Sequence, residues 1–268
     1  MQTDLEKVAN NKFFLFCLLA TGFAILISNM AGKAIANVTT DLIYIPVSGG
    51  LLVLSIVIVA KFRWSGDHGK AYLLFAGFAS FWFTAELVWF MAEVISHLSP
   101  FPAEIDWLYL AGYPFLFAFS IYYLKPFWTA LSKKMFSYAA LATLVFLVPT
   151  LYTMHSYNPD ATLPEIIWAA LYPLADAMVL FPAVLGLTLF FKGEVSLFWS
   201  LCCIAIILNI AADSGVFFLD IDKTSYSGNP INILYLWSYL LFAFGINSYV
   251  KIFTVPKMKS YDNADDLK

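Results

Sequence analysis

Residues 42–61 of the chain read LIYIPVSGGLLVLSIVIVAK, an apolar run with no charged residue before Lys61. At a rise of about 1.5 Å per residue, a helix of about 20 residues spans the roughly 30 Å hydrocarbon core of a bilayer. The run therefore predicts a transmembrane helix. The whole 268-residue chain has the same character, since 61% of its residues are apolar and 12% are charged. Soluble domains have about 45–50% and about 25%, so this composition excludes an ordinary soluble protein.

Seven further runs of similar composition lie on both sides of this one. Together they predict eight spans, at 13–32, 42–61, 71–97, 106–124, 135–154, 165–191, 195–219 and 231–253. The connections are short, about three to fifteen residues, and leave no room for a soluble domain between helices. We therefore predict an all-α, multi-pass integral protein of the cell membrane, with the lipid bilayer as its surroundings. A net charge of −3, with no basic cluster outside the membrane flanks, argues against a nucleic-acid partner.

Basic residues alternate between the two sides of the predicted bundle. One side would carry Lys33 and Lys223, and the other would carry Lys7, Lys12, Lys61, Arg63, Lys70, Lys125, Lys133, Lys134, Lys192, Lys251, Lys257, Lys259 and Lys268. Since positively charged loops stay in the cytoplasm, the split predicts cytoplasmic termini, with segments 1–12 and 254–268 outside the membrane. The alternative is a secretory signal cleaved near Ala34-Ile35-Ala36, but the apolar run is long for a signal peptide.

Self-comparison indicates an internal duplication at an offset of about 127 residues. The run LYLAGYPFLFAF at 108–119 aligns with LYLWSYLLFAFG at 234–245, so that Leu, Tyr, Leu and a second Tyr recur in register. Upstream, Ala85-Glu86 aligns with Ala212-Asp213, and the stretch from Tyr44 to Pro46 aligns with Tyr172-Pro173. We therefore predict two four-helix repeats, 13–126 and 127–253. Because four is even, both repeats enter the membrane in the same direction, which makes this a parallel repeat.

Five acidic residues fall inside or near the predicted spans. Glu86, Asp176 and Asp213 lie well inside, whereas Glu93 and Asp106 lie nearer the outer interface. A charged side chain at the bilayer centre costs about 2.5–3.5 kcal/mol on insertion scales, so each of these acids needs a physical reason. No Lys or Arg lies in a span at that depth. Desolvation then favours the neutral acid unless a bound cation or water holds the charge.

We predict that these acids line a polar cavity that opens outward and binds a small ligand, lipid or ion through two related half-sites. The candidate hydrogen-bond partners are Tyr109, Tyr113, Tyr172, Tyr235, Tyr239, Asn29 and Asn209. The nine residues predicted to bind the ligand are the five acids together with Tyr109, Tyr113, Tyr235 and Tyr239. The alternative is that protonated acids only join helices through interhelical hydrogen bonds. His97 and His155 could belong to a metal site, but two unrelated loop histidines are the simpler interpretation. The sequence assigns no catalytic residue and no cofactor.

The run FPAEIDWLYLAGYP at 101–114 resembles part of a multi-helix membrane domain that precedes GGDEF and EAL domains in bacterial cyclic-di-GMP signalling proteins. LYPLAD at 171–176, Ala212-Asp213 and Leu234-Tyr235 fit the second half of that domain. The resemblance covers most of the chain from about residue 40, and it implies a sensory input module rather than an enzyme. The sequence shows no output domain after the last span, so we expect any signal to pass to a separate membrane or cytoplasmic protein.

The chain also resembles the eight-helix, YhhN-like lysoplasmalogenases, which carry acidic residues in their third and seventh helices. Glu86 and Asp213 occupy the matching positions. The resemblance implies an ether-lipid hydrolase in which a carboxylate activates water as a general base. That family has a glycine before the acid, whereas this chain has Ala85 and Ala212, which argues against hydrolysis. A small-solute or proton-coupled transporter is a third alternative.

Overall fold

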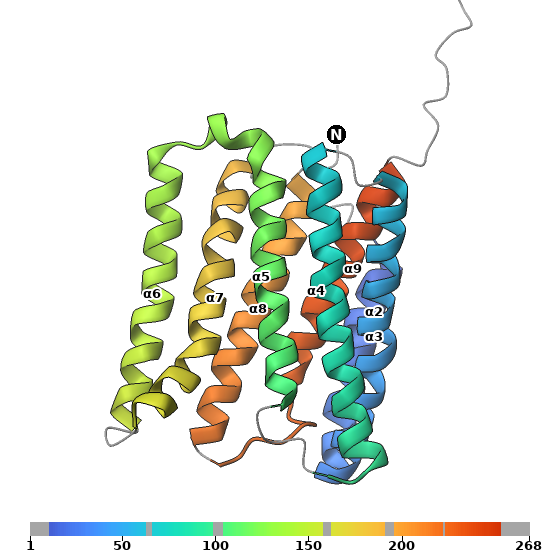
Figure 1. Cartoon of the computed structure of the whole chain (residues 1–268). Helices are drawn as coiled ribbons and strands as arrows, with labels where there is room; N and C mark the ends of the chain where they lie inside the picture. Colours follow the sequence, from blue (N-terminus) through green and yellow to red (C-terminus); the bar gives the residue numbers. More distant parts are fainter. Residues whose placement is uncertain are drawn as a thin grey trace, which may run out of the picture.

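The computed structural model describes residues 11–62, 66–98, 104–157, 162–190, 196–221 and 223–252. Within these ranges it contains eight long helices: α2 (Lys12–Met30), α3 (Lys33–Phe62), α4 (Gly66–Phe90), α5 (Glu104–Leu124), α6 (Lys133–Tyr157), α7 (Leu163–Phe190), α8 (Ser196–Ile221) and α9 (Asn232–Ile252) (Figure 1). The π-helix η1 (Met91–Ile95) continues α4, and the 3-10 helix η2 (Lys125–Ala130) continues α5. Eight helical segments are long and apolar enough to cross a membrane, which is the architecture of a multi-pass membrane protein.

Helix α3 is longer than the predicted span 42–61. It begins at Lys33 and continues through Asp41, which lies just before the first residue of the predicted span. The side chain of Asp41 is only 4% exposed. An acid that faces the interior of a bundle does not have to enter lipid, so the helix can run through it. The predicted boundary at residue 42 was therefore wrong.

Six of the eight described helices form a closed ring. Around this ring α3 contacts α4, α4 contacts α5, α5 contacts α7, α7 contacts α8, α8 contacts α9, and α9 contacts α3. The other two lie outside it, with α2 against α3 and α9 and with α6 against α7. Figure 1 shows α6 at one edge of the bundle and α2 at the other. The ring encloses the candidate site.

Basic residues gather at one end of the bundle. Helix ends that meet there carry Lys12, Lys61, Lys70, Lys125, Lys133 and Lys134, whereas Lys33 and Lys223 lie at the opposite end. We call these the lysine-rich end, which is uppermost in Figure 1, and the lysine-poor end. Helix α2 begins and α9 ends at the lysine-rich end. Nearly all of the predicted terminal segments, 1–12 and 254–268, lies outside the described residues.

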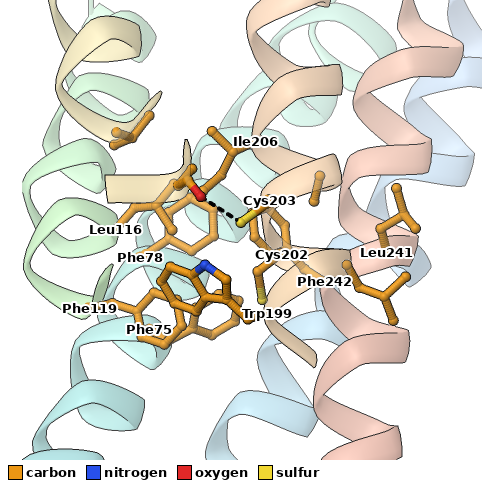
Figure 2. Close-up of a cluster of buried hydrophobic side chains, with 14 of the residues drawn as sticks. Phe75, Phe78, Leu116, Phe119, Trp199, Cys202, Cys203, Ile206, Leu241 and Phe242 are labelled. Carbon is orange, nitrogen blue, oxygen red and sulfur yellow. Dashed lines mark hydrogen bonds between the residues drawn. The ribbon is translucent and has the colours of Figure 1, made fainter. Parts of the chain in front are cut away.

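A cluster of buried aromatic side chains fills the ring toward the lysine-rich end. The ring centroid of Phe75 lies 4.9 Å from that of Phe119 and 5.4 Å from that of Phe242. Trp199, which is fully buried, stacks on Tyr123 with a centroid distance of 4.7 Å. Figure 2 shows Phe75, Phe119, Trp199 and Phe242 gathered between the helices. We call this cluster the aromatic plug, because its close packing leaves an apolar barrier across the ring.

Candidate functional site

A cavity of about 320 Å³ lies inside the ring, between the aromatic plug and the lysine-poor end. Every ring helix contributes to its walls, and residues of α6 and of the connection between α8 and α9 complete them. The volume falls at the lower end of the range of small-molecule sites, about 300–1,000 Å³. The ring therefore holds a compartment large enough for a small organic ligand.

Eight of the nine residues proposed as ligand-binding from the sequence line this cavity. They are Glu86, Asp106, Tyr109, Tyr113, Asp176, Asp213, Tyr235 and Tyr239. The ninth residue, Glu93, is not among the lining residues. The structure thus brings together acids and tyrosines from α4, α5, α7, α8 and α9, and their role in binding stays a prediction.

Tyrosine hydroxyl groups hold two of the cavity acids, Glu86 and Asp213. The hydroxyl of Tyr239 donates to Oε1 of Glu86 at 2.7 Å. On the other side of the cavity, Tyr235 donates to Oδ1 of Asp213 at 2.6 Å, and Tyr113 lies 2.9 Å from Oδ2 of the same residue. Hydrogen bonds of this kind compensate in part for the lost hydration of a buried carboxyl group. They also fix the acids in place at the cavity wall.

These contacts cross between the two halves of the chain in a reciprocal pattern. Tyr113 of α5 reaches Asp213 of α8, and Tyr239 of α9 reaches Glu86 of α4. In the sequence alignment Tyr113 corresponds to Tyr239 and Glu86 corresponds to Asp213. Each half therefore supplies an acid to the other half's tyrosine.

A second reciprocal pair lies nearer the lysine-poor end. Tyr44 of α3 donates to Oδ1 of Asn232 at the start of α9, at 2.8 Å. Tyr172 of α7 donates to Oδ1 of Asp106 at the start of α5, also at 2.8 Å. Asn232 follows Asp106 by 126 residues, which is also the spacing between the aligned residues Tyr113 and Tyr239. The ring order repeats accordingly, because α3 contacts α9 and α7 contacts α5.

Asp176 breaks this symmetry by adding a carboxyl group beside Asp213. The hydroxyl oxygen of Tyr113 lies 2.9 Å from Oδ1 of Asp176 as well as from Oδ2 of Asp213, and it accepts from Nδ2 of Asn209 at 3.3 Å. A tyrosine has one hydroxyl proton and can donate to only one of the two acids. The other contact requires a proton on a carboxyl group, which then donates to the tyrosine oxygen. The two aspartates thus form a pair that shares protons through Tyr113.

The walls of the cavity are strongly acidic. Six carboxyl groups line it, and no Lys, Arg or His is among the described residues that do so; the six are Asp41, Glu86, Asp106, Asp176, Asp213 and Asp220. Sequence reasoning missed two of these acids. Asp41 lies just before the predicted second span, and Asp220 lies just beyond the predicted seventh span. One signal was available for Asp220, which follows Glu93 at the repeat offset of about 127 residues.

Two buried acceptor atoms in the cavity wall have no partner among the described residues. They are Oδ2 of Asp41 and Oδ1 of Asn209, on opposite halves of the chain. Both side chains are almost completely buried, with exposures of 4% and 5%. A buried acceptor without a donor is costly, at about 1–3 kcal/mol. Both residues line the cavity, so a molecule or water bound there is a candidate source of the missing donors.

Glu93 holds the connection between α8 and α9 across the lysine-poor end instead of facing the cavity. It accepts from Nδ2 of Asn37 at 2.6 Å, from Nε1 of Trp89 at 2.9 Å, and from the hydroxyl of Ser227 in a short contact. Ser227 itself lines the cavity. Glu93 therefore ties α3, α4 and the connecting segment together, and its place in the ligand site stays a prediction.

The same segment is fastened to α2 and α3. The backbone N–H of Gly228 donates to Oδ1 of Asn37 at 2.8 Å, and its carbonyl accepts from Nδ2 of Asn29 at 2.8 Å. The hydroxyl of Tyr226 donates to Oδ1 of Asn29 at 2.5 Å. Asn29, expected as a partner of the acids, thus anchors the segment 223–231. We call this segment the cap, because Ser225, Tyr226 and Ser227 form part of the cavity wall.

The cavity therefore combines acids, tyrosines and a fastened cap within a membrane-protein fold. Comparisons of the chain with models of protein families, with curated proteins and with solved structures found no match.

Proposed function

We propose that the chain is a sensory or ligand-binding module of the cell membrane, whose cavity takes a small ligand from the outer side. The single observation that carries this proposal is the cavity inside the ring, with six carboxyl groups and unpartnered polar atoms in the residues of its walls. Acids that only joined helices would be satisfied by their neighbours and would not need to surround a space. The resemblance to sensory membrane domains supports the same conclusion, with a separate protein receiving the signal.

The positions of the lysines support an outward-facing site. The lysine-rich end is expected in the cytoplasm, and on this expectation the cap and the cavity face the outside. The aromatic plug lies between the cavity and the lysine-rich end, which supports a one-sided binding site rather than a continuous path. The reciprocal tyrosine–acid pairs support a duplicated bundle in which each half completes the site of the other.

Cysteine accessibility tests this proposal. Ser214 and Ser225 line the cavity, whereas Ser132 is exposed at the lysine-rich end. In a Cys17→Ser background, Ser214→Cys and Ser225→Cys should react with a membrane-impermeant thiosulfonate in intact cells. Ser132→Cys should react only after the membrane is opened. Cys202 and Cys203 are buried and serve as the unreactive baseline. Labelling of Ser132→Cys but not of the cavity variants in intact cells would refute the outward-facing site.

A hydrolase is the second candidate, and one observation favours it. Asp176 and Asp213 share protons through Tyr113 inside the cavity, and a protonated and an ionised carboxyl group side by side can act as acid and base. The substrate class implied by the resemblance to lysoplasmalogenases is an ether lipid. Purified protein should then turn over lysoplasmalogen, and Asp213→Asn should abolish the turnover. No turnover by the unaltered protein would leave the binding module as the better proposal.

A further inference from the structure

The unpartnered atoms of the cavity are acceptors, and this restricts the chemistry of a ligand. Oδ1 of Asn209, and Oδ2 of Asp41 when this acid is ionised, require hydrogen-bond donors. The amide nitrogen of Asn209 is already used, because it donates to Asp213 at 3.0 Å. A ligand that satisfies these atoms must therefore present N–H or O–H groups to the wall.

The charge of the cavity wall further restricts the chemical class of the ligand. Asp41 is one of six carboxyl groups in the cavity wall, and no cationic side chain is among the described lining residues. Buried carboxyl groups without a counter-ion favour their neutral form, and a bound cation stabilises the ionised form, which attracts the cation in turn. A cationic ligand would supply the missing charge and the missing donors at once.

Aromatic side chains between the acids indicate an organic cation rather than a metal ion. Trp82 packs edge-on against Tyr113 and Tyr239, with centroid distances of 5.8 and 5.6 Å, and all three line the cavity. Aromatic faces attract ammonium groups and also contact apolar carbon. Among the described residues, no group of three or more His, Cys, Asp or Glu has the arrangement of a metal site.

We propose that the cavity binds a small primary amine in its ammonium form, with an apolar body against the aromatic wall and N–H donors toward Asp41 and Asn209. This inference rests on the proposed function, because it requires the cavity to take a ligand. A primary ammonium carries three donors, which a quaternary ammonium lacks. The volume of about 320 Å³ suits a molecule with a single ring or a short chain.

Phenethylamine and its neutral analogue 2-phenylethanol test the proposal on the purified, unaltered protein. The two probes share the ring and the chain and differ in charge and donor number. Binding is followed by calorimetry and by the fluorescence of the tryptophans, two of which, Trp82 and Trp89, line the cavity. We expect saturable binding of phenethylamine and at least tenfold weaker binding of 2-phenylethanol. Equal affinities, or no saturable binding of the amine, would overturn the proposal without requiring any variant.

Two matched variants locate the binding. Asp41→Asn removes the unpartnered carboxylate, and we expect at least a tenfold loss of affinity for phenethylamine. Asp67→Asn makes the same chemical change outside the cavity, where Asp67 pairs with Lys125 at 2.9 Å, and should leave the affinity unchanged. The melting temperature of each variant confirms that it is folded. An unchanged affinity in folded Asp41→Asn, or saturable Ca²⁺ binding that excludes phenethylamine, would overturn the inference.

Failure of this inference is distinguishable from failure of the proposed function. If Ser214→Cys reacts from outside while phenethylamine does not bind, the cavity faces outward but takes another class of ligand. If Ser214→Cys is unreactive from outside, the proposed function itself fails.

Discussion

The hydroxyl of Tyr113 on α5 lies 2.9 Å from Oδ2 of Asp213 on α8, so the first half of the chain holds an acid of the second half. The converse contact, from Tyr239 of α9 to Glu86 of α4, measures 2.7 Å. Neither Asp213 nor Glu86 therefore depends on its own half of the chain alone. The cavity forms only when α3–α5 and α7–α9 close into one ring, and stability and ligand binding should be coupled through these tyrosines.

Removing the hydroxyl of Tyr113 should destabilise the protein, because two buried carboxyl groups and Asn209 lose a shared partner. We expect Tyr113→Phe to cost about 1–3 kcal/mol, the usual penalty for an unsatisfied buried polar group. The melting temperature in detergent measures the effect.

Tyr123, on the same helix, provides the matched control. Its hydroxyl is buried and has no hydrogen-bond partner among the described residues. Tyr123→Phe removes the same atom without removing a contact, so it should be neutral or slightly stabilising. If Tyr113→Phe and Tyr123→Phe gave equal melting temperatures, the hydrogen bonds around Tyr113 would contribute nothing measurable to stability.

Gly228→Ala should loosen the cap. A Cβ atom at this position would lie 2.4 Å from the carbonyl carbon of Ala36 and 2.5 Å from the backbone nitrogen of Asn37. Backbone atoms cannot move aside as a side-chain end can, so we expect a loss of about 1–3 kcal/mol. Gly50→Ala is the control, because a Cβ there meets no atom within 4 Å. A melting temperature of Gly228→Ala equal to that of Gly50→Ala would contradict the close packing of the cap on α3.

Gly112→Ala should shrink the cavity. A Cβ atom on α5 would lie 2.6 Å from Cδ1 and Nε1 of Trp82, and Nε1 donates to the carbonyl of Tyr109 at 3.1 Å. The indole must turn away, which changes the cavity wall and breaks this hydrogen bond. We expect a shift in tryptophan emission and weaker binding of phenethylamine than in the unaltered protein. An emission spectrum and an affinity that both match those of Gly50→Ala would show that Trp82 does not respond.

Glu93→Gln should loosen the cap without changing a residue that lines the cavity. The substitution replaces one acceptor oxygen with an N–H₂ group. The one oxygen that remains cannot accept from Asn37, Trp89 and Ser227 together. Amide hydrogen exchange in the cap should therefore become faster. Asp67→Asn, at the other end of the bundle, should leave this exchange unchanged. Equal protection of the cap in both variants would show that Glu93 is not the tie that its contacts indicate.

The amino-acid sequence determines the helices of this protein. A bilayer requires about 20 apolar residues per crossing, so the predicted runs had to become helices, and the structure confirms eight helical segments of that kind. The grouping of acids and tyrosines followed from the same reasoning, since a buried charge in a membrane must face the interior. The internal repeat inferred from residues 108–119 and 234–245 stays a prediction.

Only the tertiary structure decided which polar residues share a space. Helical periodicity fixes the face on which a side chain lies, but the rotation of one helix against another depends on packing between segments far apart in the sequence. Asp41 therefore looked like the end of a span until α3 was seen to turn it into the ring. The contact of Glu93 with Ser227 of the cap, more than 130 residues away, likewise could not be read from the sequence.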